Sequence, residues 1–228
     1  MAKKNQSINM FLGVLVIALV VFLFFVYNDK GESNLEEENP FYLGDGRICE
    51  EVVERNNYRF CSEVFSENLT IYKLEFFVGN NERIIHSFRH LPEELEDINV
   101  EEGIGAPLVI PGSDVVKNKV YLSMDPEFTG DEILVALWLP AQVLGRSNVG
   151  VFKMDVTSAF SKDYNGSDYP IRSCSDADDQ TAVIEYRRGD KKLEIEDNCI
   201  VAYGKNETEF NMVSEALTYR LIGVVQSE

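Results

Sequence analysis

One apolar segment near the N-terminus constrains this chain more than any other feature. Residues 8–27 read INMFLGVLVIALVVFLFFVY and are apolar apart from Asn9 and the small residues Gly13 and Ala18. At about 1.5 Å rise per residue, roughly 20 helical residues span about 30 Å, the thickness of a bilayer's hydrocarbon layer. Cleaved signal peptides have shorter apolar regions, about 7–15 residues, followed by small residues at the cleavage point. No small-x-small site follows residue 27, so the sequence favours an uncleaved transmembrane signal anchor at 8–27.

The charges on either side of this segment give its orientation. Lys3 and Lys4 precede it without an acidic residue, whereas the residues that follow are rich in aspartate and glutamate. The positive-inside rule therefore places residues 1–7 in the cytoplasm and exports the rest. Residues 28–46 are acidic, contain Gly, Asn and Pro, and are expected to be a linker. The sequence predicts a single-pass membrane protein whose domain, residues 47–228, is extracytoplasmic.

The exported part of the chain is strongly acidic. All 39 acidic residues lie after residue 28, together with 19 of the 21 basic ones, which gives that part a formal charge of −20. Such a charge repels phosphate backbones, so we expect no nucleic-acid partner. High solubility and a surface that attracts cations or basic partners both remain open.

All four cysteines, Cys49, Cys61, Cys174 and Cys199, lie on the exported side. An even number in an oxidising compartment favours two disulfides, which four cysteines can form in three ways. The spacing suggests Cys49 with Cys61 and Cys174 with Cys199. No two of them have CxxC spacing, so a zinc knuckle or a thioredoxin-type dithiol is not expected.

The patterns along the domain predict one α+β domain with a single mixed sheet and two main helices. Residues 48–65 suggest two strands around a turn, which would bring Cys49 opposite Cys61, and apolar residues alternate in 69–78 as in a half-buried strand. A strand–helix–strand unit is expected at 118–156, with Thr129 as helix N-cap and Pro140 as a kink.

Two elements are expected near the C-terminus. Residues 181–197 predict a hairpin that pairs Tyr186 with Leu193 and Ile184 with Ile195, and continuing this alternation places Cys199 on the same inward face. Residues 206–224 predict an amphipathic helix, because Phe210, Val213, Leu217 and Leu221 form one stripe, with Gly223 as its stop.

Two segments resemble known families. Residues 173–224, which begin SCSDADDQTAVIEY and continue through NCIVAYG to LIGV, resemble the C-terminal part of uncharacterised archaeal single-pass membrane proteins with an extracytoplasmic domain. That resemblance implies an archaeal cell-surface location, supports the Cys174–Cys199 pairing, and implies no activity. Residues 3–23 resemble the N-terminus of archaeal type IV pilin-like proteins, but Asn5 replaces the glycine before the processing site and Met10 stands where a glutamate is expected.

Three aspartates close together, Asp176, Asp178 and Asp179, are candidate ligands for a hard cation such as Ca²⁺. Counted from Asp176, an EF-hand loop would need glycine at position six and glutamate at position twelve, where this chain has Thr181 and Arg187. We therefore favour a solvated acidic turn, fixed by the disulfide of the neighbouring cysteine. A metal site of another type stays an alternative.

The only two histidines, His86 and His90, lie four residues apart, the spacing with which a helix shares a metal. Their segment predicts a strand, and Ser87 stands where a metalloprotease would have its glutamate. There is no G-x-S-x-G turn, so a serine hydrolase lacks its nucleophile. A hydrolase would require a deep pocket that holds either histidine within hydrogen-bonding distance of a serine or an aspartate.

N-glycosylation sequons occur on the exported side at Asn68, Asn165 and Asn206. The sequence assigns no catalytic residue, no resident metal and no cofactor, and enzymatic activity is not favoured. We expect a membrane-anchored binding or structural module of the cell envelope with a protein partner. A membrane-tethered enzyme or metal-binding protein and a type IV pilin-like subunit are the alternatives.

Overall fold

The computed structural model describes residues 40–43, 46–55, 58–67, 69–78, 82–128, 130–164 and 167–224, with the backbone alone at 130–132. The chain divides into two compact units, Met1–Pro40 and Phe41–Glu228. The predicted cytoplasmic segment 1–7, the membrane anchor 8–27 and most of the linker 28–46 lie outside the described residues, as do Thr129, Asn68 and Asn165. Among the described residues no helix is both long and apolar enough to cross a bilayer.

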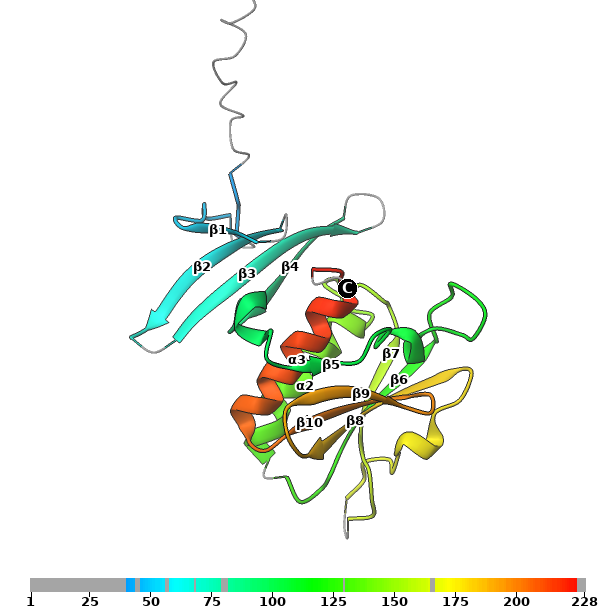
Figure 1. Ribbon diagram of the computed structural model, residues 1–228. Helices are drawn as coiled ribbons and strands as arrows, with labels where there is room; N and C mark the ends of the chain where they lie inside the picture. Colours follow the sequence, from blue (N-terminus) through cyan, green and yellow to red (C-terminus); the bar gives the residue numbers. More distant parts are fainter. Residues whose placement is uncertain are drawn as a thin grey trace, which may run out of the picture. The chain divides into compact units, whose positions relative to one another are not determined.

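The second unit is a mixed α+β fold with two sheets and two α-helices, so the predicted fold class is confirmed (Figure 1). The prediction of a single sheet was wrong, because the N-terminal strands pair only among themselves. The elements are β1 Val52–Arg55, β2 Tyr58–Ser66, β3 Leu69–Val78, β4 Glu82–Phe88, β5 Asn99–Val100, β6 Lys119–Met124, α2 Gly130–Leu144, β7 Asp155–Phe160, β8 Thr181–Arg188, β9 Lys192–Glu196, β10 Cys199–Gly204 and α3 Glu207–Leu221, with 3₁₀ turns η2 Pro92–Leu95, η3 Ala106–Leu108 and η4 Cys174–Asp176.

The first sheet is an antiparallel meander in the order β1-β2-β3-β4. Its β1–β2 hairpin pairs Val52 with Cys61, which brings Cys49 within reach of Cys61. The Cys49–Cys61 disulfide forms with a Cα–Cα distance of 5.8 Å, so this predicted pairing is confirmed. The two cysteines pack with Phe41 and Leu43 in a small cluster of buried residues, which attaches the start of the domain to this sheet.

The second sheet has six strands in the order β5-β9-β10-β8-β6-β7 and mixes parallel and antiparallel pairs. Strands β6 and β7 pair in parallel and are connected through α2, as the predicted strand–helix–strand unit requires. The third element begins later than expected, at Asp155, because the preceding Lys153 has a φ of 55°, outside the strand region. Helix α2 continues past Pro140 to Leu144.

The predicted hairpin at 181–197 is wrong, because β10 lies between β8 and β9. Ala202 of β10 pairs with Tyr186 on one side and with Leu193 on the other. The two predicted partners therefore share one row of the sheet but are separated by a whole strand. The reason is burial: β10 reads CIVAYG and is buried almost throughout, which suits a central strand, whereas β9 is only partly buried.

The Cys174–Cys199 disulfide forms, with a Cα–Cα distance of 5.2 Å, so the second predicted pairing is also confirmed. The expectation for the face of Cys199 was wrong. The turn before β10, in which Asp197 has a φ of 54°, pairs Ile195 with Ile200, so Cys199 projects from the opposite face. There it is fully buried with Val183 and Val201.

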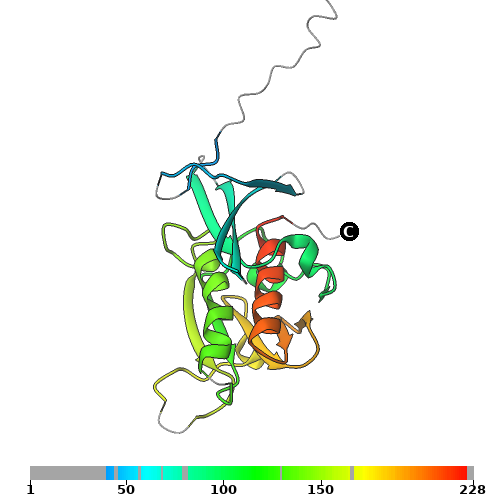
Figure 2. The ribbon, with the colours of Figure 1, turned by 90° about the vertical axis from the view of Figure 1, so that its left-hand side faces the viewer.

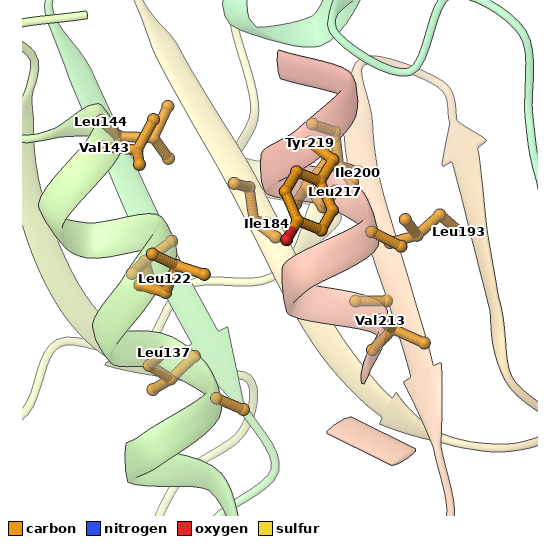
Figure 3. Close-up of a cluster of buried hydrophobic side chains, with 14 of the residues drawn as sticks. Leu122, Leu137, Val143, Leu144, Ile184, Leu193, Ile200, Val213, Leu217 and Tyr219 are labelled. Atoms are coloured by element: carbon orange, nitrogen blue, oxygen red, sulfur yellow. The ribbon is translucent and has the colours of Figure 1, made fainter. Parts of the chain in front are cut away.

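Both helices cover one face of the mixed sheet and lie side by side (Figure 2). Apolar side chains from α2, α3 and the strands form one core, in which Leu137 and Leu217 face the sheet (Figure 3). Helix α3 is amphipathic as predicted. It starts at Asn206, whose side chain accepts the Glu209 N–H, and its C-terminal turn is followed by Gly223 with a φ of 80°.

Candidate functional site

Two of the three aspartates considered as metal ligands, Asp176 and Asp178, stabilise turns. An Asp176 side-chain oxygen accepts the backbone N–H of Ser173 at 2.8 Å. The Asp178 side chain accepts the N–H groups of Gln180 at 2.8 Å and Thr181 at 2.7 Å, and these bonds lower the pKa of Asp178. Such contacts are typical of side chains that stabilise turns.

A group of potential metal ligands that includes Cys174 of this loop excludes these aspartates. Within the described parts of the chain, the group whose ligand atoms lie within 4.8 Å of one another consists of Cys174, Glu185 and Cys199. The two cysteines are joined in a disulfide and are therefore not thiolate ligands. Glu185 accepts the Cys174 N–H at 2.7 Å and thus holds η4 on the sheet.

An ion-pair network extends from Glu185 across the helix-free face of the mixed sheet. Arg187 donates to Glu185 at 2.8 Å and to Glu196 at 2.7 Å, and the Tyr203 hydroxyl donates to Glu196 at 2.8 Å. The two carboxylates raise the pKa of Arg187. These contacts connect β8, β9 and β10, so we assign the network a structural role.

The sequon at Asn206 lies on the surface, at the N-cap of α3. Its side-chain oxygen accepts the Glu209 N–H, whereas a glycan is attached through the side-chain nitrogen. The cap is therefore compatible with glycosylation, which stays a prediction.

The two histidines have different surroundings. His86 is 1% exposed, stacks on Phe76 with 5.7 Å between ring centroids, and has no hydrogen-bond partner for either ring nitrogen among the described residues. Burial lowers the pKa of His86. His90 instead contacts a carboxylate, with 2.7 Å between its Nδ1 and an oxygen of Glu215. Across the described residues no hydrogen bond joins either ring to a hydroxyl or an aspartate.

Glu215 links α3 to the end of β4. It is buried, and its two oxygens accept the backbone N–H of Arg89 at 2.7 Å and of His90 at 3.1 Å, in addition to the contact with the His90 ring. Tyr219, one turn further along α3, donates to the His90 carbonyl oxygen at 2.8 Å and stacks on Phe88. The four-stranded sheet is thus attached to α3 by a buried carboxylate.

The hydrogen bond with Glu215 makes this attachment pH-dependent, because it raises the pKa of His90 above its usual value of 6.5. A histidine whose pKa is higher in the folded than in the unfolded state stabilises the folded protein. This stabilisation is complete below the pKa of the unfolded state and is lost as pH rises through the pKa of the folded state. We expect His90→Gln to lose more free energy of unfolding, relative to the native chain, at pH 5.5 than at pH 8.5. Urea unfolding at both values measures this, and an equal loss at both would contradict it.

A cavity of about 180 Å³ opens beside Glu215. It lies between α2, α3 and the ends of β3 and β4. Most of its lining is apolar, and residues of α3 and of the end of β4 form a polar side. The whole lining consists of Ile71, Ser87, Phe88, Arg89, Val135, Ala136, Trp138, Leu139, Asn211, Ser214 and Glu215. Such a combination, an apolar concavity with a few polar groups, is what binding pockets in proteins usually show.

The polar groups of the cavity differ in whether they already have partners. Ser214 shares a hydrogen bond of 3.0 Å with the Tyr186 hydroxyl, and burial raises the pKa of Tyr186 to about 12. Asn211 is 5% exposed, yet its side-chain amide forms no hydrogen bond within the described structure. Asn211 is therefore available to a ligand.

Beside the cavity, α2 exposes an apolar ridge formed by Leu134, Val135 and Trp138. Trp138, the chain's single tryptophan, is 56% exposed although α2 otherwise contributes to the core. Val135 and Trp138 belong to the ridge and to the cavity wall alike.

Sequence reasoning did not single out Glu215, Asn211 or Trp138. One signal was present: Asn211, Ser214, Glu215 and Thr218 recur at the i, i+3, i+4, i+7 spacing of one helical face. All four are buried, so α3 has a polar stripe beside its apolar one. The apolar run of α2, by contrast, gave no indication of which face would stay exposed.

The chain was compared with protein-family models, curated proteins and solved structures. No match was found in any of the three. Its function therefore has to be argued from its own residues.

Lys117 is buried, and its ammonium has no hydrogen-bond partner among the described residues. It is 1% exposed, and burial lowers its pKa, an effect that the charges of Asp178 and Asp179 oppose. At a pH below the pKa of Lys117 in the folded state, the buried ammonium lowers the free energy of unfolding. This loss disappears as pH rises towards 10.5, the pKa of the lysine in the unfolded state.

We therefore expect Lys117→Met to raise the free energy of unfolding at pH 7 by about 1–3 kcal/mol. The gain should shrink at pH 10, as the native lysine loses its proton. Denaturant unfolding at both values checks this, with Lys119→Met as the control, because Lys119 is partly exposed and lies 4.6 Å from the Tyr121 ring centroid. A loss of stability in Lys117→Met would mean that the ammonium has a stabilising partner.

Proposed function

We propose that the protein is a membrane-anchored, extracytoplasmic binding module of the cell envelope, and that it binds a basic protein partner through the ridge and cavity of α2. The observation that carries this proposal is the exposed Trp138 at the rim of a partly polar cavity. Residues 8–27 would anchor the chain in the membrane, and residues 28–46 would hold the domain away from it.

The ridge has the composition of an interaction site. Exposed tryptophans next to pockets are enriched among the residues that dominate binding energy at protein interfaces. Leu134 and Val135, 54% and 39% exposed, extend the apolar surface along the helix. An apolar surface rimmed by polar groups is typical of a docking site in a soluble domain.

The net negative charge of the chain supports a partner of net positive charge. The part of the chain after residue 28 has 39 acidic and 19 basic residues. A strongly acidic surface speeds the encounter with a positively charged protein and disfavours acidic competitors. The two disulfides agree with an oxidising, extracytoplasmic location, where such bonds persist.

The test uses the full-length protein in native membranes. A photoreactive amino acid at Leu134 should crosslink to one protein of net positive charge, and Trp138→Glu should abolish that product. The same amino acid at Val115, which is 58% exposed and distant from the ridge in sequence, is the control. Equal crosslinking at Leu134 and Val115 would contradict the proposal that the ridge binds the partner. Protection of the domain from protease added to intact cells would contradict the proposed extracytoplasmic location.

A further inference from the structure

We propose that the cavity beside Glu215 binds the ammonium group of a lysine side chain of the partner, with the lysine's carbon stem against Trp138. This inference rests on the proposed function, because it names the chemistry by which the same surface recognises its partner. It depends on three properties of the cavity: a carboxylate with an unused acceptor position, the amide of Asn211, for which the described structure shows no hydrogen bond, and an apolar wall with an exposed indole.

Glu215 has room for one more donor. A carboxylate offers about four acceptor positions. Three are occupied, by the N–H of Arg89 on Oε1 and by the N–H and ring of His90 on Oε2. The position left on Oε1 belongs to a residue that lines the cavity. An ammonium there would form a charge-assisted hydrogen bond, which is stronger than a neutral one.

Two further residues with polar side chains line the same cavity. The side-chain amide of Asn211 and the hydroxyl of Ser87 form no other hydrogen bond in the described structure, and Asn211 is nine-tenths buried. With Glu215 they provide three acceptors from α3 and β4. A lysine ammonium has three donors and no acceptor, so its hydrogen-bonding capacity matches this set.

The remaining walls suit the lysine stem. Ile71, Val135 and Trp138 supply apolar surface, against which lysine methylenes pack while the charged end reaches polar groups. The indole of Trp138 also favours a nearby cation, since its ring face is negatively polarised. A cavity of about 180 Å³ has room for about six water molecules at about 30 Å³ each, enough for one flexible side chain.

Arg89 gives the proposal a distinctive test. It lines the cavity and its side chain is exposed, so its positive charge repels a bound ammonium. Arg89→Gln should therefore strengthen lysine binding severalfold. A carboxylate ligand would respond in the opposite way, because it would lose its cationic partner. The sign of this one effect distinguishes the two chemistries.

The experiment measures binding of a short peptide, acetyl-Leu-Lys-Leu-amide, to the full-length protein in detergent micelles. Fluorescence reports on the site directly, because Trp138 is the only tryptophan. The lysine peptide should change the emission in a saturable way, whereas the same peptide with norleucine in place of lysine should bind at least tenfold more weakly. Calorimetry provides a second measurement.

Two variants examine the polar side of the cavity. Asn211→Ala should weaken the lysine peptide about five- to tenfold without lowering the unfolding temperature, because the native amide has no partner to lose. Glu215→Gln should weaken it further, and its unfolding temperature has to be measured alongside. Equal affinity for the lysine and norleucine peptides, or no effect of Asn211→Ala, would overturn the proposal. If the crosslink at Leu134 forms nonetheless, the proposed function stands and only the lysine chemistry fails.

Discussion

Replacing Glu215 with alanine is expected to lower the free energy of unfolding by about 3–5 kcal/mol, the range found when a buried charged network loses one partner. The variant removes the acceptor of the Arg89 and His90 backbone N–H groups and of the His90 ring. These donors would stay between β4 and α3 without a partner, and each buried donor left unpaired costs about 1–3 kcal/mol. Urea unfolding of the full-length protein measures the loss.

Glu215→Gln is the matched comparison. Glutamine keeps one acceptor oxygen but brings an NH₂ group towards donors, so we expect a loss smaller than that of alanine. Asn211→Ala, in the same helix and cavity, should leave stability unchanged because its side chain forms no hydrogen bond. A loss below about 1 kcal/mol in Glu215→Ala would show that water replaces the carboxylate.

Removing the Cys174–Cys199 disulfide is expected to cost about 3.5 kcal/mol, which is the loop-closure entropy for 25 residues of sequence separation. The loss should appear as a lower midpoint in guanidinium for the double alanine variant. The corresponding figure for Cys49–Cys61, with a separation of 12, is about 2.8 kcal/mol. The two double variants are each other's controls.

The burial of Cys199 should increase the difference in free energy of unfolding between the two double alanine variants. Cys199 is fully buried with Val183 and Val201, so alanine there also leaves a cavity. Protease cleavage between residues 161 and 180 should increase only in the Cys174–Cys199 variant, because that bond and Glu185 hold η4 to the sheet. Equal losses in the two variants, or unchanged cleavage, would contradict a special role for this bond.

The sequence predicted the features that depend on neighbours along the chain. Both disulfides follow from spacing and strand pairing, and helix α3 follows from its apolar stripe and from its cap at Asn206. The strand–helix–strand unit of β6, α2 and β7 is also local, since a parallel pair needs a crossover connection.

Features that depend on distant pairing were not predictable in the same way. The predicted turn at Gly189 and Asp190 favours direct pairing of β8 with β9, yet the strongly buried β10 takes the central place. The position of Glu215 depends on contacts more than 120 residues apart in sequence, which no local pattern encodes. Trp138 became notable only because nothing in the described structure covers it.

The insertion of β10 between two earlier strands determines the order in which this fold can be completed. Synthesis delivers a chain from its N-terminus, so β8 and β9 emerge before the strand that joins them. Until residues 199–204 arrive, both strands have unpaired edges, and Cys174 has no Cys199 to bond with. A chain cut short before Cys199 would lack a central strand of its larger sheet. The domain can therefore complete its fold only after the last thirty residues have been synthesised.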